Sequence, residues 1–327
     1  MEHRSIGRLS VSVIGLGCNQ LGTAFCDESL SARIVNEALD AGITYFDTAD
    51  EYGSNYADPD DPGGWGRSEE YLGRALRSRR DEVVIGSKFG VHPHGDAERG
   101  GASRRWATLA VEASLRRLGT DRIDLYQLHF PDPDVPIEET LGALDELVAQ
   151  GKVREIGCSN LSAGALDEAA AAAARMGVRP FASTQGPLNL LQRATLDDVV
   201  PACERLGMTF IPYYPLASGM LTGKYRRGRD LPEGTRLSDQ VTEEARRRIF
   251  TDRTFDRLEA LEAYAAESGH TLLQLAFSWL LGHPNVATVI AGAAKPGQAS
   301  ANAAASEWRL TPEQVAEITK VVRSAAT

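Results

Sequence analysis

Short apolar runs alternate with amphipathic segments along most of the chain. Apolar residues recur every three or four positions, the spacing of an amphipathic helix, in segments 31–42, 68–78, 107–119, 136–151 and 196–207, and the alanine-rich segment 163–177 has helix-forming composition. Runs rich in β-branched and aromatic residues, typical of strands, occur at 11–17, 44–49, 83–90, 124–130, 153–159, 181–188, 209–215 and 286–292. This alternation predicts strand–helix–strand units around a parallel sheet.

The middle of the chain is regular. Each step from Leu125 to Val153, Phe181 and Thr209 is 28 residues, close to the ~30 residues of one strand–helix unit. Eight such units predict a (β/α)8 barrel, because closure leaves no unpaired strand edge. A doubly wound open sheet is the alternative. No linker-like stretch divides residues 1–327, so we expect one domain, opened by a hairpin that turns at Gly7 and closes the barrel floor.

Composition and charge narrow the class of protein. The 327 residues are 43% hydrophobic and carry a formal net charge of −10, which disfavours nucleic acid or an anionic membrane as a partner. The N-terminus lacks a long apolar segment, so we expect a cytoplasmic protein. Four cysteines without a C-x-x-C pair predict buried thiols, and His92 and His94 lack the further ligands that a metal site needs. We therefore expect no metal.

Polar side chains gather at the ends of the predicted strands. In a barrel these ends meet at one mouth, which is where barrel enzymes place their chemistry. Taken singly, each side chain has a structural explanation, such as a helix cap or core packing. Seven at equivalent positions favour an active site: Asp47, Tyr52, Lys88, His129, Ser159, Asn160 and Gln185.

Four of these residues form a set suited to proton transfer. A tyrosine with a pKa near ~10 is a poor proton donor at neutral pH. We expect the Lys88 ammonium to lower the pKa of Tyr52 by stabilising the phenolate, and Asp47 to keep that lysine charged and oriented. His129 would donate a hydrogen bond to a substrate oxygen. Such a group suits a carbonyl oxygen on which negative charge develops.

As a set, these motifs resemble the aldo-keto reductase family, in its bacterial branch that is similar to potassium-channel β subunits. The resemblance covers the chain from about Gly15 to Asn302, in family order. It rests on FDTADEYG, GSKFG, YQLHFPDP, EIGCSN, TQGPLNLL, PYYPLASGMLTGKY and VIAGAAKPGQASAN. It implies a barrel that binds NADPH and reduces a small aldehyde or ketone. Tyr52 is then the general acid, Lys88 and Asp47 tune it, and His129 orients the carbonyl.

The resemblance also implies a coenzyme site. Tyr213 would stack on the nicotinamide, whose carboxamide would bind Ser159, Asn160 and Gln185. Lys224 would face the pyrophosphate, and Arg236 with Lys295 favours NADPH over NADH, because a 2′-phosphate forms charge-assisted hydrogen bonds. Arg226, Arg227 and Arg229 are expected to be a solvated charge run. The remaining residues implied to contact the coenzyme are Gly17, Asn19, Pro215, Leu216, Gly292, Gln298 and Asn302.

The sequence departs from the family pattern at two places. Ala301 stands where an acidic residue is common, which weakens the expected adenine contacts. Gly186, Pro187 and Leu188 follow Gln185 where relatives often have an acid and an aromatic ring, which predicts an altered substrate pocket. Trp65, in the acidic loop after the second strand, either lines the mouth or anchors the loop.

One alternative to a reductase remains open, and one further motif is too weak to add another. The run GLGCNQLG places two glycines after a strand, but the third falls two positions late for a dinucleotide-binding turn. Some relatives are nucleotide-binding accessory subunits of channels, so an NADPH-binding regulatory subunit with little turnover is the second reading. We expect a small-molecule aldehyde or ketone as the substrate, and either a monomer or a homo-oligomer.

Overall fold

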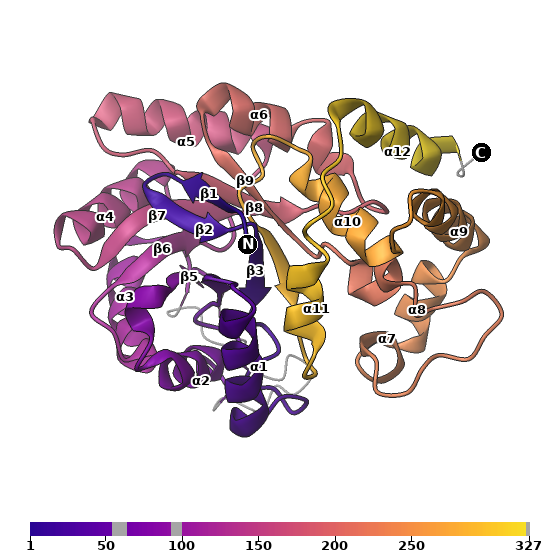
Figure 1. Ribbon diagram of the computed structural model, residues 1–327. Coiled ribbons are helices and arrows are strands. Elements are labelled where there is room, and N and C mark those ends of the chain that lie inside the picture. Colours follow the sequence, from indigo (N-terminus) through magenta and orange to yellow (C-terminus); the bar gives the residue numbers. More distant parts are fainter. Residues whose placement is uncertain (54–63, 93–99, 325–327) are drawn as a thin grey trace.

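Eight parallel strands form the centre of the computed structural model, which describes residues 1–53, 64–92 and 100–324 (Figure 1). Hydrogen bonds link the strands in the order β10-β3-β4-β5-β6-β7-β8-β9. Their bounds are β3 Ile14–Gly17, β4 Tyr45–Asp47, β5 Val84–Phe89, β6 Ile123–Leu128, β7 Val153–Ser159, β8 Ser183–Pro187, β9 Thr209–Tyr213 and β10 Val289–Gly292. A parallel bridge from Phe210 to Val286 joins β9 to the segment before β10, and the Phe210 N–H donates to the Asn285 carbonyl at 2.9 Å. The sheet is therefore the closed barrel that the sequence predicts.

A hairpin closes the floor of the barrel, as expected. Strands β1 (His3–Ile6) and β2 (Leu9–Ser12) pair antiparallel around Gly7, whose φ of +55° suits glycine. Its apolar side chains, such as Ile6 and Val11, pack with the inward-facing Tyr45 and Leu125. The run 11–17, predicted as one strand, is divided between β2 and β3, because the chain turns at Val13 from the hairpin into the barrel.

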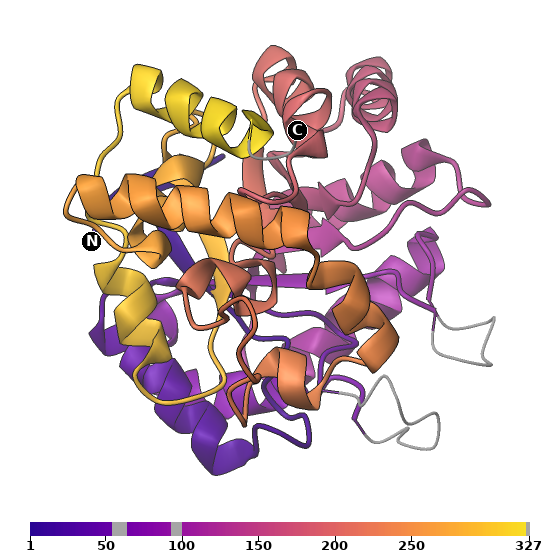
Figure 2. The same ribbon diagram turned by 90° about the vertical axis from the view of Figure 1, so that its right-hand side faces the viewer.

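Helices surround the barrel in the order of the repeat (Figures 1 and 2). Those that follow the first six barrel strands are α1 Glu28–Asp40, α2 Arg67–Leu76, α3 Arg104–Leu118, α4 Ile137–Ala149, α5 Ala163–Met176 and α6 Val199–Leu206, with short 3-10 turns at Arg80–Glu82 and Ala194–Leu196. Ser103 and Ser162 cap the starts of α3 and α5, where each accepts a hydrogen bond from a backbone N–H. Gly119 and Gly177 end the same helices in the left-handed conformation. Cap and glycine thus fix where these two helices begin and end.

The expected long excursion follows β9. It contains the 3-10 turn η3 (Ala217–Thr222) and the helices α7 Arg236–Asp239, α8 Glu243–Ile249 and α9 Asp252–Glu267 before α10 Leu272–Leu281 leads to β10. The last helices are α11 Gln298–Ala304 and α12 Pro312–Ser324, and α12 packs against α9. In Figure 1, α7, α8 and α9 lie together to one side of the barrel. These helices belong to the segment between β9 and β10, the seventh and eighth strands of the barrel.

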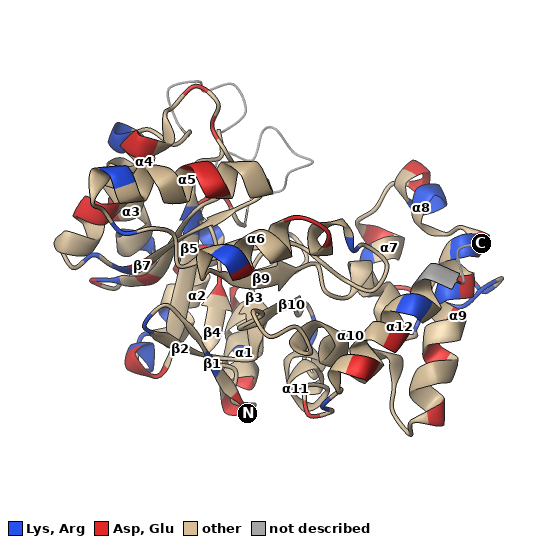
Figure 3. Cartoon of the chain, turned by 90° about the horizontal axis from the view of Figure 1, so that it is seen from above, with Lys and Arg blue, Asp and Glu red and all other residues tan. Residues whose placement is uncertain are grey.

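Charge is confined mainly to the outside of the molecule. Figure 3 shows acidic and basic residues interspersed on the surrounding helices. All four cysteines are unpaired and buried, which confirms the predicted thiols. Among the described residues, no helix is long and apolar enough to cross a membrane. The charged side chains that are buried inside the barrel are therefore exceptional.

Candidate active site

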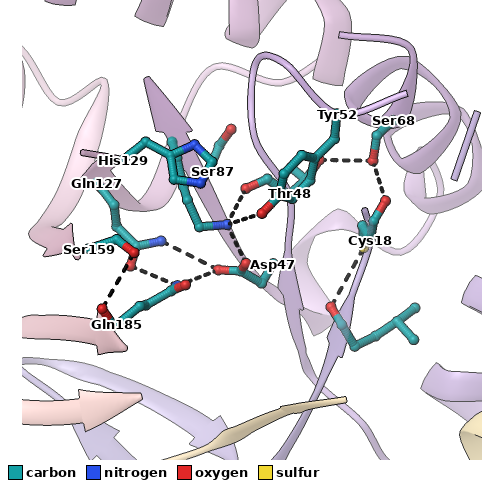
Figure 4. Close-up of polar contacts among 12 residues, drawn as sticks. Cys18, Asp47, Thr48, Tyr52, Ser68, Ser87, Gln127, His129, Ser159 and Gln185 are labelled. Carbon is teal, nitrogen blue, oxygen red and sulfur yellow. Dashed lines mark hydrogen bonds and ion pairs between the residues drawn. The ribbon is translucent and has the colours of Figure 1, made fainter. Parts of the chain in front are cut away.

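Asp47 and Lys88 form a buried ion pair at the carboxyl ends of neighbouring strands (Figure 4). Asp47 is the last residue of β4 and Lys88 lies one residue before the end of β5, and their exposed fractions are 3% and 1%. The Lys88 ammonium also donates to the Thr48 carbonyl at 2.9 Å and lies 3.4 Å from the Tyr52 hydroxyl. Lys88 is therefore not a surface side chain, and its charge is held directly beside the phenol.

The second carboxylate oxygen of Asp47 accepts hydrogen bonds from inside the barrel. The donors are the Tyr45 hydroxyl at 3.0 Å, the Gln185 amide at 2.6 Å and the Gln127 amide at 3.4 Å. Sequence reasoning missed Tyr45 and Gln127. Each lies two residues before a predicted site residue, Asp47 or His129, and so faces the same side of its strand, which is the signal that could have found them. These contacts fix the orientation of the carboxylate.

Tyr52 remains a neutral phenol. Its ring centroid lies 4.8 Å from the Lys88 ammonium. Burial, together with the carboxylates of Asp47 and Glu51, raises the pKa of Tyr52 well above its usual value. The expected lowering by Lys88 is wrong, because Asp47 already neutralises that cation while burial penalises the phenolate. The arrangement keeps a proton on the phenol beside a cation that can stabilise the charge left after its transfer.

His129 lies across from the phenol. Its ring contacts the Tyr52 ring edge to face, with centroids 5.8 Å apart, and the Phe130 ring stacks on it with centroids 4.8 Å apart. Burial and the Lys88 cation lower the pKa of His129 well below its usual value, so the imidazole is neutral at neutral pH. Its Nδ1 lies 3.3 Å from a carboxylate oxygen of Glu51. The four predicted catalytic residues therefore converge at one end of the barrel.

The residues expected to hold the carboxamide also lie together. Asn160 donates to the Ser159 hydroxyl at 3.0 Å and accepts from the Tyr213 hydroxyl at 2.8 Å, and Ser159 donates to the backbone carbonyl of Gln185 at 3.4 Å. The amide NH2 of Gln185 is bound by Asp47 and Gln127, so its carbonyl is the group left for a ligand. The half-buried Tyr213 ends β9 directly before the turn that holds Pro215 and Leu216.

A second group of predicted coenzyme residues lies where β3 and β10 end. Gly17 and Gly292 are register partners, and Asn302 donates to the Gly292 carbonyl at 3.4 Å. The Asn19 side-chain oxygen is also near, since it would lie 4.0 Å from a Cβ at Gly292. Gln298 accepts from two backbone N–H groups of the preceding loop, at 2.7 and 3.0 Å. Its side chain therefore shapes that loop.

Glu37 of α1 is a contact of this second group that sequence reasoning missed. Its carboxylate accepts from the backbone N–H groups of Gly297 and Ser300 at 2.7 and 2.9 Å. These two residues flank the start of α11, where the resemblance had indicated adenosine contacts. The carboxylate joins α1 to this segment, and no local sequence pattern marks a contact between residues 260 positions apart.

Two lysines without acidic partners lie beyond this group. Burial and the nearby Lys295 ammonium lower the pKa of Lys224. Within the described parts of the chain neither lysine forms an ion pair, whereas Arg226 and Arg227 bind acidic residues of α9 in exposed ion pairs, as expected of solvated charge. Lys295 also reaches the segment before Arg236, since a Cβ at Gly234 would lie 2.9 Å from its Nζ. Lys224 and Lys295, here called the lysine pair, can hold an anion.

The structure describes only some of the residues that were predicted to lie around the mouth of the barrel. Trp65 is half-buried two residues before α2, but His94 and residues 54–63 of the acidic loop lie outside the described residues. Among residues 1–53, 64–92 and 100–324, no group of three or more His, Cys, Asp or Glu side chains is arranged to hold a metal ion.

Comparison with known proteins places the chain in a family. The model of the Aldo/keto reductase family matches residues 13–323. The aldo-keto reductase YhdN of Bacillus subtilis is 34% identical over 99% of this chain and 94% of its own length, and a probable voltage-gated potassium channel subunit beta of Oryza sativa is 32% identical over 99% and 97%.

A solved structure agrees with these sequence relatives. The glycerol dehydrogenase of Gluconobacter oxydans superposes with a TM-score of 0.79 at 30% identity, over 97% of this chain and 93% of that one. Sequence and structure thus agree over nearly the whole length, and the protein belongs to the aldo/keto reductase family.

Proposed function

We propose that this protein is an NADPH-dependent reductase of aldehydes and ketones in which Tyr52 is the general acid. Its family supports an oxidoreductase acting on small-molecule carbonyl compounds. The observation that carries the finer proposal is the buried Lys88–Asp47 ion pair, whose ammonium lies 3.4 Å from the Tyr52 hydroxyl. A buried cation at this place stabilises a phenolate that forms only during the reaction.

Each residue of the cluster has one task in the proposed reaction. NADPH, when bound, supplies the hydride to the carbonyl carbon. Tyr52 holds a proton on its hydroxyl and gives it to the carbonyl oxygen, which becomes the alcohol. Lys88 stabilises the phenolate that remains, and Asp47 keeps Lys88 charged and in place. His129 contacts the substrate oxygen and so fixes its distance from Tyr52.

The coenzyme fits the remaining groups. The half-buried ring of Tyr213 offers an aromatic face for the nicotinamide, and Asn160 and the Gln185 carbonyl offer partners for its carboxamide. The lysine pair supplies positive charge for phosphates against a net charge of −10. Because this charge and Arg236 suit a 2′-phosphate, we infer a preference for NADPH over NADH. We also propose a single cytoplasmic domain.

A regulatory subunit with little turnover is the second candidate. It is favoured by the 32% identity to the probable channel subunit of Oryza sativa. The complete set of Asp47, Tyr52, Lys88 and His129 favours catalysis instead, because binding a coenzyme does not require a proton donor.

Turnover by the purified protein separates the two candidates. NADPH or NADH is mixed with a panel of aldehydes and ketones, and the absorbance of the reduced nicotinamide is followed, with coenzyme binding measured separately by quenching of protein fluorescence. We expect oxidation of NADPH by several carbonyl compounds, faster than that of NADH. Tight NADPH binding with no oxidation by any compound would favour the regulatory subunit.

A further inference from the structure

Gln127 of β6 is a buried amide inside the barrel that has no task in the proposed reaction. Its exposed fraction is 0%, and it contacts two residues of the site (Figure 4). Its amide NH2 lies 3.4 Å from the Asp47 carboxylate, and its carbonyl accepts a hydrogen bond from the Gln185 NH2 at 2.9 Å. Gln127 therefore joins the carboxylate that binds Lys88 to a residue of the proposed coenzyme site.

Gly157 of β7 leaves the space in which the two glutamines meet. Gln127 and Gly157 are register partners on neighbouring strands, and Gln185 lies on β8, the next strand of the barrel. A Cβ at Gly157 would lie 3.2 Å from the Gln127 Cγ and 2.8 Å from the Ser183 hydroxyl oxygen. The Gln127 side chain thus passes over a strand position without a side chain, which lets it reach from β6 to β8.

The carboxylate of Asp47 determines which way both amides point. An ionised carboxylate only accepts hydrogen bonds, so each glutamine presents its NH2 to Asp47. The Gln127 carbonyl then faces Gln185 and accepts from it. Because the Gln185 NH2 binds Asp47 at 2.6 Å and Gln127 at 2.9 Å, contacts to two different partners fix the plane of this amide. If the amide turned over, its carbonyl would face two other acceptors.

The side-chain carbonyl of Gln185 is the group that this arrangement leaves for a ligand. No residue in 1–53, 64–92 or 100–324 donates a hydrogen bond to it, and it is not among the fully buried polar atoms that lack a partner. The neighbouring Asn160 is held close, since its backbone N–H donates to the Gln185 backbone carbonyl at 3.0 Å. A free carbonyl favours a ligand group that donates, and the carboxamide NH2 of a nicotinamide is such a group.

We propose that Gln127 is a positioning residue for Gln185, whose side-chain carbonyl it directs toward the NH2 group of the nicotinamide carboxamide. This inference rests on the proposed function, because that function supplies the nicotinamide. Since its exposed fraction is 0%, Gln127 does not touch a ligand and acts through Gln185. Without Gln127, one N–H of Gln185 is buried without a partner, and the amide can rotate about its remaining bond to Asp47. The carbonyl is then no longer held in one direction.

The consequence is selectivity for the carboxamide group of the coenzyme. A coenzyme analogue with an acetyl group in place of the carboxamide keeps the carbonyl oxygen but has a methyl group where the NH2 donor was. Such an analogue has nothing to donate to Gln185, so the direction of the Gln185 carbonyl should not affect its binding. The rest of the analogue is identical, so a general loss of stability or of phosphate binding affects both coenzymes alike.

Isothermal titration calorimetry of the full chain tests the inference without any turnover. The ligands are NADP+ and its 3-acetylpyridine analogue, and the variant is Gln127→Met, which removes the amide but keeps the length of the side chain. We expect the Kd for NADP+ to rise by about 3- to 10-fold, the loss of one neutral hydrogen bond, and the Kd for the analogue to change by less than about twofold. Equal changes for the two ligands, or no change for either, would overturn the inference.

Further variants serve as controls. Gln150→Met makes the same chemical change at the exposed end of α4 and should leave both Kd values unchanged. Gln127→Glu is measured below neutral pH, where the added carboxyl beside Asp47 keeps its proton. It then retains a carbonyl that accepts and an O–H that donates, and should bind both ligands like the wild type. A loss of selectivity in Gln127→Glu as large as in Gln127→Met would contradict the inference. If Gln127→Met does not fold, Gln127→Asn, which withdraws the carbonyl from Gln185 by one methylene group, replaces it with the same expectation.

Turnover then separates this inference from the proposed function. Normal reduction of carbonyl compounds, with Gln127→Met changing the two Kd values equally, would overturn the inference alone. Protein whose selectivity for the carboxamide depends on Gln127 but which oxidises NADPH with no carbonyl compound would uphold the inference and overturn the proposed function. Wild-type protein that binds neither ligand would overturn both.

Discussion

Lys88, near the end of β5, and the lysine pair, which lies outside the strands, differ in what neutralises their charge. Lys88 is 1% exposed, paired with Asp47 and in contact with the Tyr52 hydroxyl. The lysine pair, Lys224 and Lys295, is more exposed and has no acidic partner among the described residues. A cation whose partners are built into the fold is preorganised for a charge that forms transiently, whereas cations without partners are available to an anionic ligand. In the proposed function, this difference separates the residues that transfer the proton from those that bind the phosphates of the coenzyme.

Replacement of Lys88 should have the largest effect on stability and turnover. Lys88→Met leaves the Asp47 carboxylate buried without its cation, which should lower the free energy of unfolding by about 3 to 5 kcal/mol. Turnover should fall further than the Kd for NADPH rises. Lys152→Met, which breaks an ion pair that is about one-third exposed, is the matched control and should cost about 1 kcal/mol or less. Equal losses of stability in the two variants, measured by urea unfolding, would mean that the Asp47–Lys88 pair is not specially placed.

The hydrogen bond from Tyr45 to Asp47 can be disturbed by adding one methyl group at Gly86. A Cβ at Gly86 would lie 2.5 Å from the Tyr45 hydroxyl, which donates to Asp47. Gly86→Ala should therefore lower the free energy of unfolding by about 1 to 3 kcal/mol, as overpacking of a core does, and also reduce turnover.

Two comparisons show whether the clash is the cause. Gly164→Ala lies in α5 with no heavy atom within 4 Å of its new Cβ, and should stabilise the protein slightly. Removing the Tyr45 hydroxyl in Gly86→Ala/Tyr45→Phe should restore part of the lost stability. A double variant no more stable than Gly86→Ala would count against the contact.

Replacing either lysine of the pair should weaken coenzyme binding without lowering stability, the opposite of replacing Lys88. Lys224→Ala and Lys295→Ala should each weaken NADPH binding by about 10- to 100-fold, the value of a charge-assisted hydrogen bond, with unfolding free energies unchanged or slightly raised because like charges no longer repel. Arg226→Ala, whose side chain is bound to Glu262, should leave the Kd for NADPH unchanged. Isothermal titration calorimetry measures the Kd for NADPH in each variant. Equal losses of affinity in all three variants would indicate a general effect of net charge on binding.

Most of the fold followed from the sequence because its signals are local. The 28-residue step, the glycines that end helices and the runs of β-branched residues each depend on neighbouring residues. Gly7 marked the hairpin for the same reason. The division of 11–17 at Val13 could not be predicted, because the run is continuously strand-like and only the geometry of the barrel floor requires a turn there.

The site was predicted less completely, since many of its contacts join distant parts of the chain. Residues at strand ends, such as Lys88 and His129, could be found because the barrel brings equivalent positions together. Tyr45 and Gln127 lie deeper, in β4 and β6, where a polar side chain does not follow the end of a strand. The pKa of Tyr52 was predicted in the wrong direction, because a sequence shows the cation near the tyrosine but not the burial that outweighs it.

The central claim is that the Tyr52 hydroxyl gives its proton to the substrate, and Tyr52→Phe tests it most directly. The measurement is single-turnover oxidation of NADPH by the best carbonyl substrate, at saturating coenzyme, in wild type and variant. We predict a rate lower by about 10²- to 10⁴-fold, the usual contribution of a general acid, with the Kd for NADPH unchanged within about twofold. A rate equal to that of the wild type would contradict the assignment of Tyr52 as the acid.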